Sequence, residues 1–283
     1  MCAQITGFRM KLSDRMQVIA DHVDAGETLA DIGTDHGQIP VWLFARGICP
    51  KVILSDISEG SIRKAEETAA AYQFGQDMSF RTGDGLQVLR SGEADTVIIA
   101  GMGGKLIRQI LDSDPEHTAS FRKFIMQPRK GSGPLRKWLL EHGYLITGED
   151  VVREGHFIPE IITAVSPAFA GGATGAEHDG PEDRTGFDGP EDRTEPAAPV
   201  DLAETDREHL MGLDEQDIRL RVPPWMVLAK GPMEDYFKLR ISQETLILEN
   251  LRRAKKRDPV SEDRVRENLE YLRTLENQYK EKL

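Results

Sequence analysis

Carboxylates and glycines follow an apolar segment near the N-terminus of the chain. Residues 28–37 read TLADIGTDHG, in which an apolar run ends at Asp31 and leads through Gly33 to Asp35 and His36. Glycine permits a tight turn and a close approach of the backbone to a ligand. A glycine loop that binds a dinucleotide leaves its backbone N–H groups for a pyrophosphate. Carboxylates would repel that group and attract a cation, so we expect this loop to bind a cationic ligand.

Three later apolar runs also end in residues that suit a nucleoside. Asp56 lies some 20–25 positions after the glycine turn, where an acidic residue can accept hydrogen bonds from a ribose diol. Asp84 lies between two glycines and could accept a hydrogen bond from an adenine amino group. Residues 101–104 contain three glycines, which let the backbone pass close to the reacting centre. Together these features favour S-adenosylmethionine over NAD. The expected cofactor-binding residues are Asp31, Gly33, Asp56, Ile57, Asp84, Gly85, Ala100 and Gly101.

Each of these signals is weak when it is taken alone. An aspartate at a strand end is most often a turn or cap residue, and a single histidine such as His36 is most often a hydrogen-bonded structural residue. The order and spacing of the four signals, each at a successive strand end, favour a nucleotide-like ligand site.

Apolar runs and helix-compatible stretches alternate through the first part of the chain. The runs cover residues 28–33, 51–57, 78–82, 94–104, 122–128, 144–152 and 157–165. Such alternation indicates an α/β fold with a mostly parallel sheet that helices cover on both faces. Only four residues separate the last two runs, which predicts an antiparallel hairpin at the end of the sheet. A helix over residues 12–23 is expected to begin at the N-cap Ser13.

The rest of the chain consists of two segments that differ in composition. Residues 168–219 are rich in Gly, Ala, Pro and acidic residues and contain GPEDRT twice, which predicts a disordered insertion. Residues 220–283 contain two long helical patterns that are broken at Pro259, and Ser261 could cap the second helix. These patterns predict an antiparallel helical hairpin, similar to a short coiled coil, with one edge against the main domain.

The net charge of −12 does not exclude a nucleic-acid partner, because it is concentrated in one segment. Residues 171–221 contain 15 Asp and Glu against five Lys and Arg, which leaves about −2 for the rest of the chain. Cys2 and Cys49 have no metal or disulfide pattern, so we expect no metal site and a cytoplasmic location. No run of about 18 apolar residues exists, so no membrane association is expected.

The sequence resembles the bacterial tRNA (adenine-22-N1)-methyltransferase family, whose members are class I S-adenosylmethionine-dependent methyltransferases with a Rossmann-like sheet. The motifs that carry the resemblance are KLSDRMQVIADHV, ADIGTDHGQIP, GDGLQVL, ADTVIIAGMGG and QPRKGSGPLRKWL. It covers residues 9–167 well, as a methyltransferase domain, and 220–283 more loosely. The acidic insertion and Arg129, where the family often has Asn, depart from the pattern.

The resemblance implies methyl transfer to N1 of an adenine in the D-arm region of tRNA, by an enzyme expected to be a monomer. The residues expected to take part in catalysis are Asp35, His36 and Met102. The residues expected to contact RNA are Arg129, Lys130, Arg136, Arg252, Arg253, Lys255 and Lys256. Three alternatives remain open: a methyltransferase for a small molecule or a protein, a methyltransferase-like module that only binds RNA, and an NAD oxidoreductase.

Overall fold

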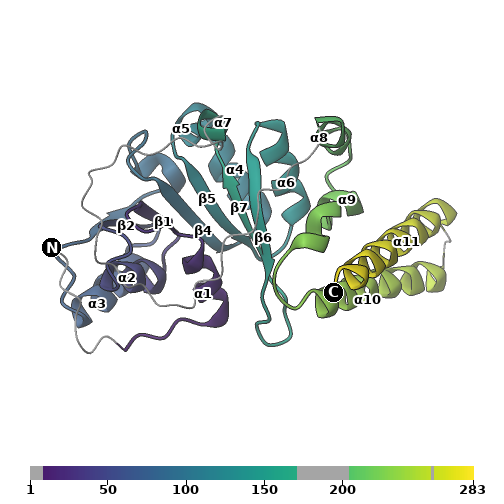
Figure 1. Ribbon diagram of the computed structural model, residues 1–283, viewed down its shortest axis with the longest axis horizontal. Coiled ribbons are helices and arrows are strands. Elements are labelled where there is room, and N and C mark those ends of the chain that lie inside the picture. The colour runs from purple at the N-terminus through teal and green to yellow at the C-terminus, as the bar shows by residue number, and fades with distance from the viewer. Residues whose placement is uncertain (1–8, 171–203, 256–257) are drawn as a thin grey trace.

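The computed structural model describes residues 9–170, 204–255 and 258–283, which form a seven-stranded sheet flanked by helices (Figure 1). The strands are β1 (Thr28–Ile32), β2 (Lys51–Asp56), β3 (Ser79–Thr82), β4 (Thr96–Met102), β5 (Lys123–Pro128), β6 (Leu145–Val151) and β7 (Glu160–Val165). Their order is β3-β2-β1-β4-β5-β7-β6. The first five are parallel, whereas β7 is antiparallel to both β5 and β6. The strand order therefore reverses between β1 and β4, the point at which open α/β sheets bind ligands.

Helices cover both faces of the sheet, and none of those described is long and apolar enough to cross a membrane. The helices are α1 (Asp14–Asp21), α2 (Gln38–Ala45), α3 (Glu59–Ala71), α4 (Gly104–Asp112), α5 (Pro115–Ala119), α6 (Ser132–Glu141), α7 (Pro167–Ala170), α8 (Glu204–Met211), α9 (Ile218–Arg221), α10 (Met233–Arg253) and α11 (Pro259–Lys282), with the 3-10 turns η1 (Gly85–Val88) and η2 (Pro224–Leu228). Helices α1, α2 and α3 pack on one face, and α4 and α6 pack on the other. The predicted α/β class and the antiparallel end of the sheet are confirmed.

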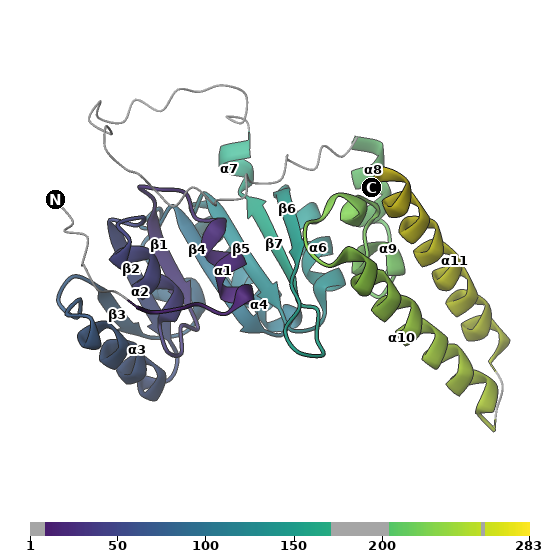
Figure 2. The same cartoon turned by 60° about the horizontal axis from the view of Figure 1, so that its bottom comes forward.

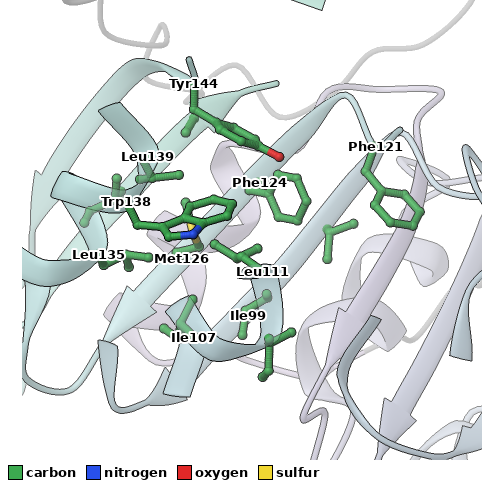
Figure 3. Packing of buried hydrophobic residues seen from close by; sticks show 14 of the residues in the cluster. Ile99, Ile107, Leu111, Phe121, Phe124, Met126, Leu135, Trp138, Leu139 and Tyr144 are labelled. Carbon is green, nitrogen blue, oxygen red and sulfur yellow. The ribbon is translucent and has the colours of Figure 1, made fainter. Parts of the chain in front are cut away.

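Successive residues of the central strands enter two different cores. Ile99 of β4 faces the core beneath α4 and α6, where Trp138 and Leu111 pack (Figure 3). Its neighbour Ile98 faces the core beneath α1, α2 and α3, and both isoleucines are fully buried. Because both faces are covered, the strands have continuous apolar sequences instead of alternating ones.

The structure confirms one of the two predicted helix N-caps and corrects the other. Ser13 caps α1 as predicted, since its side chain accepts a hydrogen bond from the N–H of Met16 at 3.4 Å. The first C-terminal helix ends before Pro259, as predicted, but Pro259 is itself the first residue of the next helix. The residue that caps this helix is Asp258, whose carboxylate accepts from the N–H of Ser261 at 3.2 Å. The prediction of Ser261 as the cap was wrong by three positions.

Helices α10 and α11 lie side by side and run in opposite directions, and their connected ends project away from the sheet (Figure 2). Leu248, Val265 and Leu269 pack between them in the projecting half. Nearer to the sheet, Phe237 and Leu272 join a cluster that includes Val151 of β6. One end of the helix pair therefore packs against the sheet domain, as predicted.

The prediction of a disordered insertion over residues 168–219 was wrong at both ends, and residues 171–203 lie outside the described part of the chain. Residues 167–170 are helical, and α8 and α9 occupy 204–211 and 218–221. Leu210 and Ile218 are buried, so this acidic stretch contributes apolar side chains to the cores. The average composition concealed these few apolar positions because acidic neighbours surround them.

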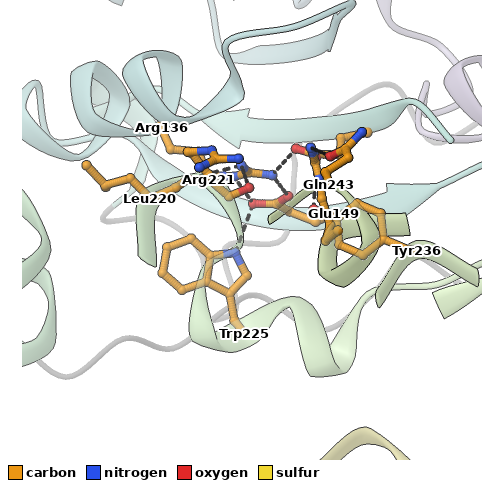
Figure 4. A network of polar contacts seen from close by, with 9 residues as sticks. Arg136, Glu149, Leu220, Arg221, Trp225, Tyr236 and Gln243 are labelled. Carbon is orange, nitrogen blue, oxygen red and sulfur yellow. Dashed lines mark hydrogen bonds and ion pairs between the residues drawn. The ribbon is translucent and has the colours of Figure 1, made fainter. Parts of the chain in front are cut away.

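A buried polar network joins the sheet to the C-terminal region (Figure 4). The guanidinium of Arg136 in α6, fully buried, donates to Glu149 at 2.8 Å and to Glu160 at 2.7 Å. Burial alone would raise the pKa of Glu160, but Arg240 and Arg136 hold this pKa at about 2. Trp225 donates to Glu149 at 2.9 Å, which ties η2 to β6. The network thus pairs every one of these charges and fixes the attachment of the C-terminal region.

Candidate functional site

The ends of β1, β2 and β4 bring the predicted cofactor residues to one edge of the sheet. Ile32 of β1 lies opposite Ser55 of β2 and Ile99 of β4 in the strand register. The backbone N–H groups of Gly33 and Thr34 both donate to the carbonyl of Ser55, at 2.7 and 3.0 Å. The loop after β1 is therefore held against the end of β2, at the point where the strand order reverses.

Asp31 supplies a buried carboxylate at this point. Its residue is 6% exposed, and its Oδ2 accepts a hydrogen bond from the hydroxyl of Thr34 at 2.7 Å. Burial raises the pKa of Asp31 to about 6, the Thr34 hydrogen bond opposes this rise, and the negative charge of Asp56 adds to it. A cation bound beside Asp31 would relieve the cost of this charge. The carboxylate is therefore poised for a cationic group.

Gly33, just after β1, lies against the side chain of Met102 at the end of β4. Gly33 has a φ of +76°, and a Cβ added there would lie 2.1 Å from Cε of Met102. Glycine at this position is required both by the left-handed backbone and by the methionine side chain. Met102, expected to be catalytic, thus packs over the first turn of the loop.

The end of β4 exposes bare backbone beside this turn. Gly101 has a φ of +76° and lies where the pairing of β4 with β5 shifts register. A Cβ added at Gly101 or Gly103 would meet no atom within 4 Å. The carbonyl of Met102 accepts from the N–H of Arg129 at 2.7 Å, which fixes this segment to the end of β5. The two glycines leave room for a ligand to approach the main chain closely.

The ends of β2 and β3 carry the residues predicted to bind a nucleoside. Asp56 accepts a hydrogen bond from the N–H of Ser58 at 2.8 Å, and its own carbonyl accepts from the N–H of Gly83 at 3.1 Å. Ile57 is 72% exposed, so it offers an apolar surface beside Asp56. Asp84 is exposed at the N-cap of η1, where its side chain makes no capping hydrogen bond.

Two of the predicted cofactor residues have packing roles in the structure. A Cβ at Gly85 would lie 3.1 Å from Ile110 of α4, so close packing and the positive φ of +53° account for this glycine. Ala100 is half-buried and packs against the core beneath α1, α2 and α3.

Asp35 and His36 lie on the exposed part of the loop after β1. Asp35 has a φ of +46°, and its carboxylate is paired with the ammonium group of Lys64 at 3.0 Å. Nε2 of His36 lies 3.6 Å from the other carboxylate oxygen of Asp35. Lys64 of α3, which was not predicted to belong to the site, therefore partly neutralises the carboxylate of Asp35.

Arg15 and Gln127 form a contact at the same edge that sequence reasoning also missed. Gln127 lies next to the last residue of β5, is 3% exposed, and accepts a hydrogen bond from Nη1 of Arg15 at 3.2 Å. Nε of Arg15 donates to both carboxylate oxygens of Glu154, at 3.1 and 3.2 Å. Arg15 is more than a hundred positions from both of its partners, so only the fold reveals these contacts.

The residues predicted to contact RNA fall into separate groups. Arg129 and Lys130 are exposed just after β5, at the edge that carries the candidate site. Arg252, Arg253 and Lys255 are exposed at the projecting end of the helix pair (Figure 2), and Lys256 lies outside the described residues.

The prediction for Arg136 was wrong. Its side chain is fully buried between Glu149 and Glu160, where no RNA can reach it. A basic residue on an otherwise amphipathic helix looks the same in sequence whether its partner is a phosphate or a buried carboxylate. Within the described residues, no group of three or more His, Cys, Asp and Glu side chains is arranged to hold a metal ion.

Residues 12–162 match the family described as "Methyltransferase domain", and this range includes the ends of β1 to β5 that form the candidate site. The chain therefore belongs to the methyltransferase-domain family. It is 32% identical over 155 residues to the tRNA (adenine(22)-N(1))-methyltransferase of Bacillus subtilis (strain 168), a match that covers 55% of this chain. The chain spans 65% of the length of that relative, slightly less than two thirds.

Solved structures share the fold over nearly the whole chain. A protein of Streptococcus pneumoniae has a TM-score of 0.70 at 19% identity, covering 94% of this chain and 99% of its own. The m1A22 tRNA methyltransferase of B. subtilis has a TM-score of 0.65 at 24% identity, covering 96% and 99%. A third structure, from M. capricolum and in complex with S-adenosyl-homocysteine, has a TM-score of 0.62 at 19% identity, covering 94% and 98%. The predicted Rossmann-like methyltransferase fold is confirmed.

Proposed function

We propose that this protein transfers a methyl group from S-adenosylmethionine to N1 of an adenine in tRNA, at position 22 in the D-arm region. The observation that carries the proposal is the buried carboxylate of Asp31 at the point where strand order reverses, beside the bare backbone of Gly101 and Gly103. The 32% identity to the B. subtilis enzyme supports the choice of tRNA adenine as the substrate. The proposal includes action as a monomer in the cytoplasm.

The residues present fit the proposed cofactor. When bound, S-adenosylmethionine supplies an electrophilic methyl group on a cationic sulfur. Asp31 would hold the positively charged methionine end, because its buried charge has no cationic partner in the described structure. Asp56 would accept from the ribose hydroxyls, and the exposed Ile57 would contact a face of the adenine. Asp84 would accept from the adenine amino group.

The substrate sets modest chemical demands on the side chains. N1 of a neutral adenine already carries a lone pair, so no strong base is required before the methyl group is attacked. The main work of the chain is to align the reacting atoms and to exclude water. N1 lies on the pairing edge of adenine, so the base must be unpaired or flipped out before it can enter the site. A carboxylate near the base, such as that of Asp35, would stabilise the positive charge that N1 methylation creates.

The direct test is mass spectrometry of nucleosides from tRNA incubated with the protein and isotopically labelled S-adenosylmethionine. The expected product is labelled 1-methyladenosine, which a tRNA transcript with guanine in place of the target adenine should fail to yield. Label in another nucleoside, or at another position, would contradict the assignment of the substrate. Absence of label in tRNA, with cofactor binding intact, would favour a small-molecule or protein substrate.

Replacing Asp35 with asparagine is expected to lower kcat about tenfold. The change keeps the shape of the side chain but removes the charge proposed to stabilise the methylated adenine, and about 1.4 kcal/mol corresponds to tenfold. The exposed position of Asp35 and its pairing with Lys64 argue against a larger effect. Steady-state kinetics with unchanged affinities for cofactor and tRNA would match an interaction made mainly in the transition state. Lost cofactor affinity with kcat intact would instead assign Asp35 to the cofactor.

Replacing Arg252, Arg253 and Lys255 together with glutamine is expected to raise the KM for tRNA and to flatten its salt dependence. Fewer counterions are released when fewer phosphates are neutralised, so each lost contact reduces the salt slope by about 0.7–0.9. The measurement is KM for tRNA over a series of salt concentrations, with cofactor affinity as the control. An unchanged slope would identify this basic run as a solvated helix end.

A further inference from the structure

The loop between β6 and β7 lies at the same edge of the sheet as the candidate site. Met126 of β5 pairs with Ile162 of the antiparallel β7, so β7 starts where β5 ends. The loop extends beyond this edge, at the bottom of Figure 1, between α1 and α10. Phe157 lies in it and is 75% exposed.

The loop is held in a defined position relative to the site. The backbones of Glu154 and Phe157 exchange two hydrogen bonds, at 2.9 and 3.0 Å, across a tight turn in which Gly155 has a φ of +60°. Both carboxylate oxygens of Glu154 accept from Arg15, which also donates to Gln127 at the end of β5. Arg15 therefore connects the turn that carries Phe157 directly to the end of a central strand.

The exposure of this aromatic ring is not explained by packing within the chain. Among the described phenylalanine, tyrosine and tryptophan residues, only Phe157 and Phe169 are exposed, and Phe169 lies beyond the opposite end of β7. A tight turn is usually made of small polar residues, whereas this turn holds a phenylalanine that buries little of its surface in the free protein. Arg153, whose guanidinium is paired with Asp235 of α10, and His156 are exposed in the same loop, and they give this rim donors for phosphates.

We propose that Phe157 is a substrate-positioning residue whose ring stacks on an unpaired nucleobase of the RNA next to the methylated adenine. A flat ring accepts any base face, and basic or polar neighbours contact the backbone, which is the usual arrangement in proteins that bind single-stranded nucleic acids. This inference rests on the proposed function, because an RNA substrate must place unpaired bases at this edge. It adds a contact outside the cofactor site and outside the basic run at the projecting helix ends.

Kinetics of three Phe157 variants and one control variant test the proposal. Phe157→Ala is expected to raise the KM for tRNA about tenfold and to leave the affinity for S-adenosylmethionine unchanged. Phe157→Tyr keeps the aromatic ring and should behave as the parent, whereas Phe157→Leu keeps apolar surface without a flat ring and should resemble the alanine variant. Phe169→Ala removes an exposed phenylalanine, 42% accessible, at the opposite edge of the sheet and should leave both the KM and the cofactor affinity unchanged. Equal KM values for the parent and Phe157→Ala would overturn the proposal, and a parental KM for Phe157→Leu would overturn stacking.

A binding measurement separates this inference from the proposed function. The natural tryptophans Trp42, Trp138 and Trp225 are buried, so Phe157→Trp introduces an exposed fluorophore that acrylamide quenches selectively. Binding of an unmodified tRNA transcript should change the emission of this tryptophan and protect it from acrylamide quenching. A fully paired RNA duplex should do neither. If adenine N1 is not methylated but this protection occurs, the proposed reaction fails and the base contact stands. If methylation occurs without protection, the base contact fails and the reaction stands.

Discussion

Asp31→Asn is expected to weaken S-adenosylmethionine binding by roughly a hundredfold while it raises the melting temperature of the free protein. The amide can still accept from Thr34, but it lacks the charge that faces the cationic end of the cofactor. Losing one partner of a buried charge pair costs about 2–5 kcal/mol of binding free energy, and a hundredfold is about 2.7 kcal/mol. Calorimetric titration with the cofactor measures the loss.

The gain in stability follows from the pKa of Asp31. Burial raises this pKa to about 6 from 3.8, so the folded protein binds a proton more tightly than the unfolded chain. The stability contribution of this group is complete below about pH 4 and is lost as the pH rises through 6. At pH 7 the buried charge therefore costs about 3 kcal/mol, at about 1.4 kcal/mol for each unit. Asparagine removes that cost, so melting should rise by several degrees at pH 7 and change little at pH 4.

Weaker cofactor binding together with a higher melting temperature would identify Asp31 as a binding residue and not a structural one. Asp77→Asn is a matched control, because Asp77 is exposed before β3 at the far edge of the sheet and should alter neither quantity. In the parent protein, cofactor affinity should also fall as the pH drops below about 6. A variant that melts earlier and binds normally would show that Asp31 stabilises the fold instead.

Arg136→Met is expected to destabilise the protein by about 3–5 kcal/mol, which corresponds to a melting temperature lower by roughly 10 °C. The change leaves the buried carboxylates of Glu149 and Glu160 with one guanidinium, that of Arg240, between them. Thermal unfolding of the parent and the variant provides the measurement. An RNA-binding role would instead give a normal melting temperature with a weaker salt dependence of tRNA binding.

Two further variants make the test specific to buried charge. Arg129→Met removes an exposed arginine and should leave the melting temperature unchanged. Adding Glu149→Gln to Arg136→Met equalises the remaining charges, so the double variant should recover part of the lost stability. If the double variant is no more stable than Arg136→Met alone, the loss comes from packing and not from an uncompensated charge.

Features with a local cause could be predicted from the sequence. The seven apolar runs contain the seven strands, and the glycines at their carboxyl ends mark real changes of backbone direction, as the positive φ of Gly33 and Gly101 shows. The rule that parallel strands end at one edge was then enough to bring Asp31 and Asp56 together.

Features that depend on distant partners could not be predicted in this way. Arg136 reads as a surface cation until Glu149 and Glu160 are seen to face it, and Lys64 gains meaning only through Asp35. The helices α8 and α9 are stabilised by a few buried positions such as Leu210, which the acidic composition of their segment concealed. In each case the decisive energy comes from tertiary contact, to which periodicity and composition are blind.

The buried charge network also sets an order of events during biosynthesis. Arg136, Glu149 and Glu160 leave the ribosome within 24 residues of one another, but Arg240, the second cation, follows Glu160 by 80 residues. At roughly 5–20 residues per second, the wait is about 4–16 seconds. For that time the nascent sheet has two carboxylates against one guanidinium at its β7–β6 side, so it cannot bury this edge at full stability. The C-terminal helices therefore complete the folding of strands that were synthesised long before them.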